Sequence, residues 1–170
     1  MGRIGKAIAR RLNGFGIDIH YHNRSKVDPA EEATLGATYN ENLDHLLKTA
    51  HFIFLSCPLT PQTHHILNEE RLNALRSDAI IINTGRGPLI DEAALSNILH
   101  SNKIAGAGLD VFEKEPEIHP DLLSAPNAVL LPHIGSATKE TRREMGLLAV
   151  RAIVGILQGK PASKIPNLIC

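Results

Sequence analysis

The segment from Ile80 to Asp91 is the feature that most constrains the fold. Its apolar run ends at Asn83, a turn with two glycines follows, and a helical pattern begins at Asp91. A short apolar run bounded by glycines is typical of a buried strand in a parallel sheet. Ligands bind at the carboxyl ends of such strands, so the side chain of Arg86, between the two glycines, is expected where a ligand would lie.

Arg86 offers a planar guanidinium that can give a carboxylate two parallel hydrogen bonds. This chemistry favours a role in binding a small acid. A lone arginine in a loop is also commonly a solvated turn residue, and the segment alone does not separate the two interpretations. The remainder of the chain has to distinguish them.

Short apolar runs alternate with helical patterns along most of the chain. The pattern predicts strands at 17–21, 52–55, 80–83, 105–112 and 129–131, and helices at 2–12, 41–48, 67–75 and 91–100. Two closely spaced prolines, Pro58 and Pro61, predict a loop after the second of these strands. Strands separated by helices indicate βαβ units, and therefore an α/β fold with a parallel sheet.

The strand rhythm stops after Gly135. A long helix is predicted next, capped by Ser136 or Thr138 and ended by Gly159. This change divides the chain into a predicted α/β domain over residues 1–136 and a C-terminal appendage over residues 137–170.

The composition is that of a soluble globular protein. Of the 170 residues, 43% are hydrophobic and 21% are charged, and the formal net charge is zero. A chain of this length can bury a substantial core. The neutral charge balance gives no reason to expect binding to nucleic acid or to an anionic membrane. No apolar run approaches the roughly 20 residues that span a bilayer.

Histidine and cysteine usage gives no sign of a metal site or a disulfide framework. The nine histidines do not show the spacing of metal ligands. The two cysteines, Cys57 and Cys170, fit a reducing compartment. We therefore expect a cytoplasmic protein without a bound metal.

The first residues admit two targeting interpretations. Gly2 after the initial methionine suggests myristoylation, but Lys6 stands where that motif requires serine or threonine. Basic residues at positions 3, 6, 10 and 11 resemble a mitochondrial transit peptide. A nucleotide-binding role explains the same segment better.

Three polar residues fall near the ends of successive predicted strands: Arg86, Glu115 and His133. A carboxylate beside an imidazole orients the ring and favours its charged form, which is a common acid–base arrangement. Together with a cation that binds a carboxylate, the set would suit 2-hydroxy or 2-oxo acids. A structural histidine after Pro132 and ordinary loop polarity at Glu115 are the alternatives.

The amino-terminal helix carries a second indication. Gly2 and Gly5 have the spacing of the last two glycines of G-x-G-x-x-G, which let a pyrophosphate approach a helix N-terminus. Asn23, Arg24 and Ser25 begin 18 residues after Gly5, where NAD enzymes usually hold the ribose with an acidic residue. An arginine and a hydroxyl suit a 2′-phosphate and favour NADP(H), although a solvated Asn-Arg-Ser turn explains them equally well.

Six segments together resemble the D-isomer-specific 2-hydroxyacid dehydrogenases, and most of all their glyoxylate/hydroxypyruvate reductase branch. In chain order they are M-G-R-I-G-K-A, H-N-R-S, C-P-L-T-P-Q-T-H-H, I-I-N-T-G-R-G-P-L-I-D, G-A-G-L-D-V-F-E-K-E-P and L-L-P-H-I-G-S-A-T. They span almost the whole chain in the family's order. The resemblance implies a Rossmann-type parallel sheet and the reduction of small 2-oxoacids such as glyoxylate and hydroxypyruvate to D-2-hydroxyacids.

The resemblance also implies roles for individual residues. Arg86 would bind the substrate carboxylate and 2-oxo oxygen, His133 would exchange a proton with the carbonyl oxygen, and Glu115 would hold the protonated imidazole. Hydride would pass between the nicotinamide and the substrate carbon. The residues implied in binding NADP(H), with NAD(H) less favoured, are Gly2, Arg3, Ile4, Gly5, Asn23, Arg24, Ser25, Cys57, Pro58, Thr63, Thr84, Asp110, His133 and Gly135.

The chain departs from the family in where it starts. The first fingerprint glycine, the first strand and most of the substrate domain would precede Met1, so residues 137–170 are expected to be a remnant of that second domain. Loss of a central strand would leave sheet edges open and apolar surface exposed. We therefore expect either a fragment or a wrongly started reading of a longer enzyme, homodimeric when complete, or a truncated dinucleotide-binding module without activity.

Overall fold

The computed structural model describes residues 1–165, so Cys170 lies outside the described residues. The chain forms two compact units, and the second begins at His133. Assignment of residues 1–136 and 137–170 to a cofactor domain and a substrate-domain remnant stays a prediction.

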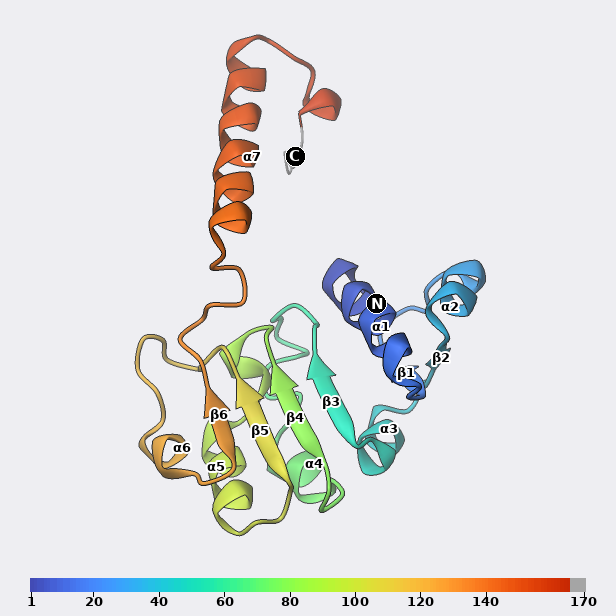
Figure 1. Ribbon diagram of the computed structural model, residues 1–170, viewed down its shortest axis with the longest axis vertical. Coiled ribbons are helices and arrows are strands. Elements are labelled where there is room, and N and C mark those ends of the chain that lie inside the picture. Colours follow the sequence, from blue (N-terminus) through green and yellow to red (C-terminus); the bar gives the residue numbers. More distant parts are fainter. Residues whose placement is uncertain (166–170) are drawn as a thin grey trace. The chain divides into compact units, whose positions relative to one another are not determined.

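The strands of the first unit form two parallel sheets (Figure 1). In the smaller sheet, β1 (Ile19–Tyr21) pairs with β2 (Ala37–Tyr39). The larger sheet has the order β3-β4-β5-β6, and its strands are Phe52–Leu55, Ile80–Asn83, Gly106–Leu109 and Ala128–Leu130. Every pairing in both sheets is parallel, which confirms the predicted α/β class.

Helices connect the strands of the first unit. The connecting helices are α2 (Pro29–Leu35), α3 (Leu43–Thr49), α4 (Glu69–Asn73), α5 (Glu92–His100) and α6 (Pro120–Ser124), with the single turn η2 (Gly87–Leu89) between β4 and α5. Before β1 lie α1 (Arg3–Leu12) and the single turn η1 (Asn13–Phe15). Capping side chains fix several starts, because an Asn or Asp oxygen accepts a first-turn N–H. Asp91 does this for α5 by accepting from Ala94.

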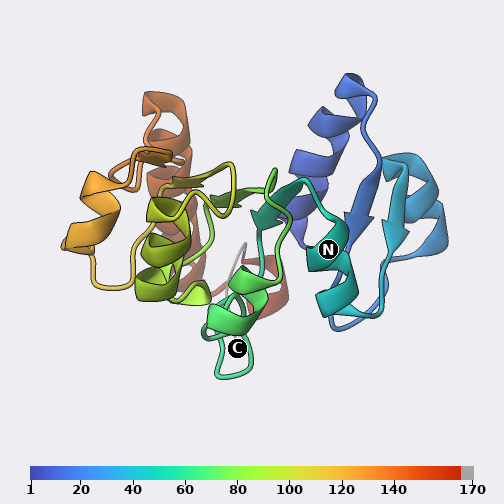
Figure 2. The same ribbon diagram turned by 90° about the horizontal axis from the view of Figure 1, so that it is seen from below.

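One face of the larger sheet builds the main core. Ile53, Ile81 and Ala107 stand in register on this face and are buried. Figures 1 and 2 show α4 and α5 on this side of the sheet, where Leu72 and Leu95 are fully buried. The core therefore fixes the strands and the helices that follow them. The loops at the carboxyl ends of the strands are less constrained by packing and can form a binding site.

The other face of β3 carries exposed aromatic side chains. Phe52 and Phe54 are 53% and 36% exposed, and β3 is an edge strand of its sheet. The open edge and exposed apolar surface agree with the expectation from the sequence.

A smaller core joins α1 and α2 to the two-stranded sheet. Its buried residues are Ala9, Tyr21, Leu35 and Ala37. An ion pair of 2.6 Å between Lys6 and Glu31 links the two helices. In α1, Ile4 is exposed and Ala9 is the buried residue.

The second unit contains α7 (Lys139–Leu157) and η3 (Ala162–Lys164). Thr138 caps α7 by accepting from the Thr141 N–H at 3.2 Å. Gly159 follows the helix with a φ of 66°, a conformation that favours glycine. The predicted start and stop of this helix are therefore confirmed. Within the described residues, no helix combines the length and apolar character that a bilayer crossing requires.

Several predicted elements need correction. The pattern of the sequence does not predict α2, β2 or α6, and the predicted helix at 67–75 is shortened to α4. The predicted strand at 105–112 leaves the ladder after Leu109, although Val111 and Phe112 stay buried. Burial without strand pairing gives the same apolar pattern as a longer strand, which explains the error.

Candidate functional site

Three loops follow neighbouring parallel strands and so leave the larger sheet at the same edge. They cover residues 56–68 after β3, 84–91 after β4 and 110–119 after β5. This edge is where ligands bind in open parallel sheets. The loops bring together predicted site residues that are far apart in the sequence, among them Thr63, Arg86 and Glu115.

The turn that carries Arg86 is built by Asn83. This side chain is 1% exposed, its Nδ2 donates to the Arg86 carbonyl at 2.9 Å, and its Oδ1 accepts from the Gly85 N–H at 3.0 Å. The Arg86 side chain is exposed and its Nη1 donates to the Gly85 carbonyl at 2.7 Å. A buried amide therefore fixes the backbone, while the guanidinium remains on the surface.

The loop that carries Glu115 packs against this turn. A Cβ placed on Gly87 would lie 1.9 Å from the carbonyl carbon of Phe112, so only glycine allows the two backbones to approach this closely. The Phe112 N–H donates to Glu115 Oε1 at 3.0 Å. Buried Asp110 donates its N–H to the Asn83 carbonyl at 3.0 Å, which joins the start of this loop to β4.

Sequence reasoning missed a network beside these loops. The Glu113 N–H donates to Glu92 Oε1 at 2.7 Å, and Glu113 Oε1 lies 2.6 Å from His65 Nε2. Burial raises the pKa of the Glu92 carboxyl, and the neighbouring charges of Glu113 and Glu115 raise it further, against the lowering effect of the Glu113 N–H and His119. No local signal predicts this network, because its members belong to three separate segments of the chain.

The loop after β3 is held by Thr63. Its hydroxyl donates to the Pro58 carbonyl at 2.7 Å and accepts from the Thr60 N–H at 2.8 Å. Burial raises the pKa of the Cys57 thiol, which disfavours the thiolate form. Pro58 and Cys57 therefore belong to a loop whose shape the Thr63 hydroxyl maintains.

The N-terminus of α1 fits a pyrophosphate. Gly2 is the N-cap residue, no side chain caps the helix, and the first turn contains no acidic residue. A Cβ on Gly2 would meet no protein atom within 4 Å, and one on Gly5 would lie 2.9 Å from the flexible Met1 side chain. Uncapped N–H groups and the helix dipole favour an anion at such an end, beside the exposed Arg3 and Ile4.

Asn23, Arg24 and Ser25 form a turn directly after β1. Asn23 Nδ2 donates to the Ser25 carbonyl at 3.2 Å, and the Tyr39 hydroxyl donates to the Asn23 carbonyl at 3.2 Å. Arg24 is exposed. The turn is thus ordered by its neighbours and presents a cation, which agrees with both interpretations made from the sequence.

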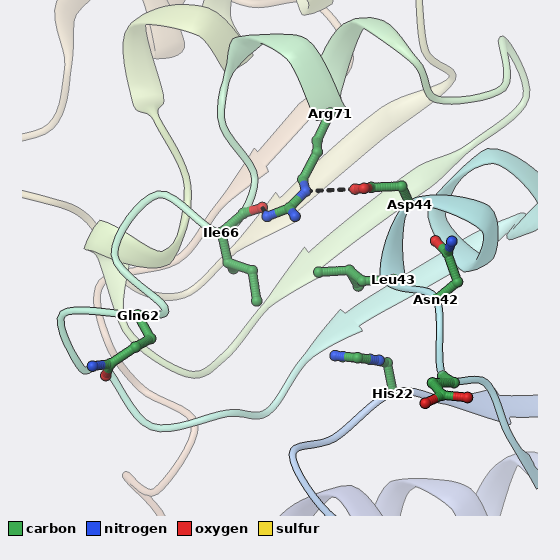
Figure 3. A pocket seen from close by; sticks show the side chains of 8 residues that line it. His22, Asn42, Leu43, Asp44, Gln62, Ile66 and Arg71 are labelled. Atoms are coloured by element: carbon green, nitrogen blue, oxygen red, sulfur yellow. Dashed lines mark hydrogen bonds and ion pairs between the residues drawn. The ribbon is translucent and has the colours of Figure 1, made fainter.

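A pocket of about 650 Å³ lies next to two of these segments (Figure 3). Its lining residues are His22, Glu41, Asn42, Leu43, Asp44, Gln62, Ile66 and Arg71. His22 adjoins the Asn23 turn, and Gln62 adjoins Thr63, but no predicted cofactor residue lines the pocket. Arg71 donates to Asp44 at 2.7 Å and to the Ile66 carbonyl at 2.9 Å, so its guanidinium holds these elements together.

His133 and Gly135 begin the second unit. His133 has a φ of 53°. Their part in the site stays a prediction, as does the contact of Thr84 and Asp110 with a cofactor. Among residues 1–165, no cluster of His, Cys, Asp and Glu side chains is suited to hold a metal ion.

The fold and this edge define a class: a Rossmann-type nucleotide-binding α/β protein with an arginine turn at the carboxyl ends of its strands. Residues 1–135 match the family described as "D-isomer specific 2-hydroxyacid dehydrogenase, NAD binding domain". The chain belongs to this family, as the resemblance predicted.

Its relatives include glyoxylate and hydroxypyruvate reductases. It is 46% identical over 166 residues to a glyoxylate reductase of Thermococcus onnurineus, covering 98% of this chain and 49% of the relative. It is 49% identical over 162 residues to glyoxylate/hydroxypyruvate reductase B of Citrobacter koseri, covering 94% of this chain and 49% of the relative.

A solved structure is similarly close. The NADPH-dependent glyoxylate/hydroxypyruvate reductase of Sinorhizobium meliloti, in complex with NADP and malonate, is 44% identical with a TM-score of 0.84. The match covers 91% of this chain and 47% of that one. The chain thus spans about half the length of the relatives it matches.

Proposed function

We propose that this chain forms the cofactor-binding half of an NADP(H)-preferring reductase that converts glyoxylate, hydroxypyruvate and related small 2-oxoacids to 2-hydroxyacids, of D configuration where the product is chiral. The observation that carries the proposal is the packing of Gly87 on the Phe112 backbone, which brings the Arg86 turn beside the Glu115 loop. The names of the relatives from Thermococcus onnurineus and Citrobacter koseri support the substrate class.

Arg86 is the substrate-binding residue in this proposal. Its exposed guanidinium would bind the carboxylate of the 2-oxoacid through two hydrogen bonds and stabilise charge on the 2-oxo oxygen. Because Asn83 fixes the turn, this cation is positioned before the substrate arrives.

His133 is the proposed acid and Glu115 its partner. The imidazolium would give its proton to the 2-oxo oxygen during reduction and recover it during oxidation, while the Glu115 carboxylate holds the charged ring. The left-handed φ of His133 supports a functional role, since backbone strain of this kind clusters at active sites.

The cofactor, when bound, supplies the hydride that reaches the substrate carbon. Gly2, Arg3, Ile4 and Gly5 would hold its pyrophosphate, and Asn23, Arg24 and Ser25 its 2′-phosphate. Cys57, Pro58, Thr63 and Gly135 would line the groove, and Thr84 and Asp110 would contact the carboxamide. Preference for NADP(H) over NAD(H) rests on Arg24 and on the NADPH-dependent Sinorhizobium relative. We place the complete enzyme in the cytoplasm as a homodimer.

The test uses the native polypeptide that carries this chain, purified from its source. Hydroxypyruvate and glyoxylate are supplied with NADPH, and the configuration of the glycerate formed from hydroxypyruvate is determined. We expect turnover of both acids and D-glycerate, and loss of turnover in His133→Ala. Binding of NADPH without turnover would instead establish a dinucleotide-binding module. Lack of NADPH binding would overturn both functions.

A further inference from the structure

Glu92, Glu113 and His65 form a network that has no assigned role in the proposed reaction. Glu92 is the first residue of α5, Glu113 lies in the loop after β5, and His65 lies in the loop after β3. The bonds of 2.7 Å from the Glu113 N–H to Glu92 and of 2.6 Å between Glu113 and His65 connect all three segments. These segments border the Arg86 turn, and the loop after β5 also carries Glu115.

The Glu92 carboxylate is buried for a reason other than packing. The residue is 5% exposed, and a buried carboxylate without hydrogen bonds is costly. An apolar side chain would fill the same position at a lower cost in free energy. What the carboxylate adds is therefore a hydrogen-bond acceptor. The acceptor is used by the Glu113 N–H, and the Glu92 N–H points back to Glu113 Oε1 at 3.4 Å.

Two contacts meet on one peptide unit. The peptide between Phe112 and Glu113 is bonded through its N–H to Glu92, and its carbonyl carbon is the atom nearest to a Cβ placed on Gly87. The preceding N–H of the backbone, that of Phe112, donates to Glu115 Oε1 at 3.0 Å. The bond to Glu92 therefore acts on the backbone that orients Glu115.

His65 completes the connection to the Arg86 turn. Its backbone N–H donates to the Pro88 carbonyl at 2.8 Å, directly after the Gly87 contact. Its φ of 47° lies in the left-handed region. In this conformation the backbone of His65 contacts Pro88 while its side chain contacts Glu113. His65 thus holds the Arg86 turn and the Glu115 loop at once.

We propose that Glu92 is a positioning residue for 2-oxoacid reduction, which bonds Glu113 and, with His65, holds the loop of Glu115 in a fixed relation to the turn of Arg86. This inference rests on the proposed function. It assigns Glu92 no contact with substrate or cofactor. Its effect is to keep the substrate-binding cation and the partner of the acid in one geometry.

The kinetic test compares Glu92→Leu with Glu92→Gln in the native polypeptide. Leucine removes the acceptor, and we expect kcat for hydroxypyruvate to fall about tenfold to a hundredfold, since small displacements of reacting groups have effects of this size. The Kd for NADPH should change much less than kcat, because the proposed pyrophosphate and 2′-phosphate contacts lie on α1 and the Arg24 turn, outside the three loops. Glutamine keeps an acceptor oxygen and should retain most of the wild-type kcat.

Glu69→Leu is the matched control. Glu69 is likewise the first residue of its helix, α4, but it is exposed, so the same substitution there should leave kcat unchanged. Wild-type kcat in Glu92→Leu would overturn the inference. So would an equal loss of kcat in the Leu and Gln variants.

Amide hydrogen exchange separates this inference from the proposed function. Glu92→Leu should increase exchange of the Glu113 amide at least about tenfold relative to wild type, and Glu92→Gln should not. His65→Asn tests the other contact, because asparagine tolerates a left-handed φ but is too short to reach Glu113. The His65→Asn variant should likewise increase amide exchange in the loop that contains Glu113. Unchanged exchange of the Glu113 amide in both Glu92→Leu and His65→Asn contradicts the inference, even if the polypeptide proves to be inactive. An inactive polypeptide in which these variants do alter exchange contradicts only the proposed function.

Discussion

Gly87 lies so close to Phe112 that a Cβ on the glycine would approach the Phe112 carbonyl carbon to 1.9 Å. The two residues belong to the turn after β4 and the loop after β5. Gly87→Ala must push these backbones apart, and we expect a loss of about 3 kcal/mol or more in the free energy of unfolding, as in severe overpacking. Urea denaturation of Gly87→Ala and wild type measures this loss.

Gly108→Ala is the control for this prediction. A Cβ on Gly108, in β5, meets no atom within 4 Å, so the change in unfolding free energy should stay below about 1 kcal/mol. Equal stability of the two variants would mean that the close approach of the two loops is not a real constraint.

Asn83 should be required for the shape of the Arg86 turn. Asn83→Ala removes the bonds to the Arg86 carbonyl and the Gly85 N–H, and leaves both groups without their buried partner. We expect a destabilisation of about 2 kcal/mol and a lower kcat/KM for 2-oxoacids. Asn97→Ala, on the exposed side of α5, should change neither quantity. A stable Asn83→Ala variant with normal kcat/KM would contradict this account of the turn.

Glu92 should make stability depend on pH. Burial raises its pKa above the ordinary glutamate value of 4.5, so the folded state favours the protonated carboxyl. Its contribution to stability is present below that ordinary value and is lost as pH rises through the raised pKa. Glutamine cannot ionise, so the stability of Glu92→Gln relative to wild type should increase with pH and then level off.

Urea denaturation between about pH 4 and about pH 8 measures this difference. A difference that is constant over the range, or that decreases as pH rises, would show that the Glu92 carboxyl does not titrate with a raised pKa in the folded protein.

Arg24 should select NADPH over NADH. Removing a guanidinium from a phosphate costs a charge-assisted hydrogen bond, so Arg24→Ala should raise the Kd for NADPH about tenfold or more and change that for NADH by less than about twofold. Fluorescence titration with both cofactors measures this, with Arg10→Ala at the end of α1 as the control. An equal loss for both cofactors would reject the assignment of Arg24 to the 2′-phosphate.

The sequence predicted those elements whose pattern is local and strong. β3 and β4 appear at the predicted residues, because a short apolar run between turn residues has few other solutions. β2 was missed because Ala37–Tyr39 is a strand only through its pairing with β1. α2 and α6 are too short to show a helical period, and Pro29 and Pro120 at their first positions look like loop residues.

The candidate site was predictable only in part. Motifs predict Arg86 and Glu115 as candidate site residues, since each stands inside a segment with a recognisable pattern. The bonds that position them were not predictable, because Glu113 and His65 are 48 residues apart in the chain. Contacts of this kind depend on how β3, β4 and β5 align, which periodicity does not specify.

Turnover of hydroxypyruvate by Arg86→Ala is the most direct test of the proposed reaction. Without the guanidinium, kcat/KM for hydroxypyruvate should fall about a hundredfold or more, while the Kd for NADPH stays near that of wild type. Arg76→Ala is the matched control, because Arg76 precedes β4 at its other end and pairs with Asp78 at 2.8 Å. We expect loss of turnover in Arg86→Ala and wild-type turnover in Arg76→Ala. Wild-type kcat/KM in Arg86→Ala would contradict the proposed reaction.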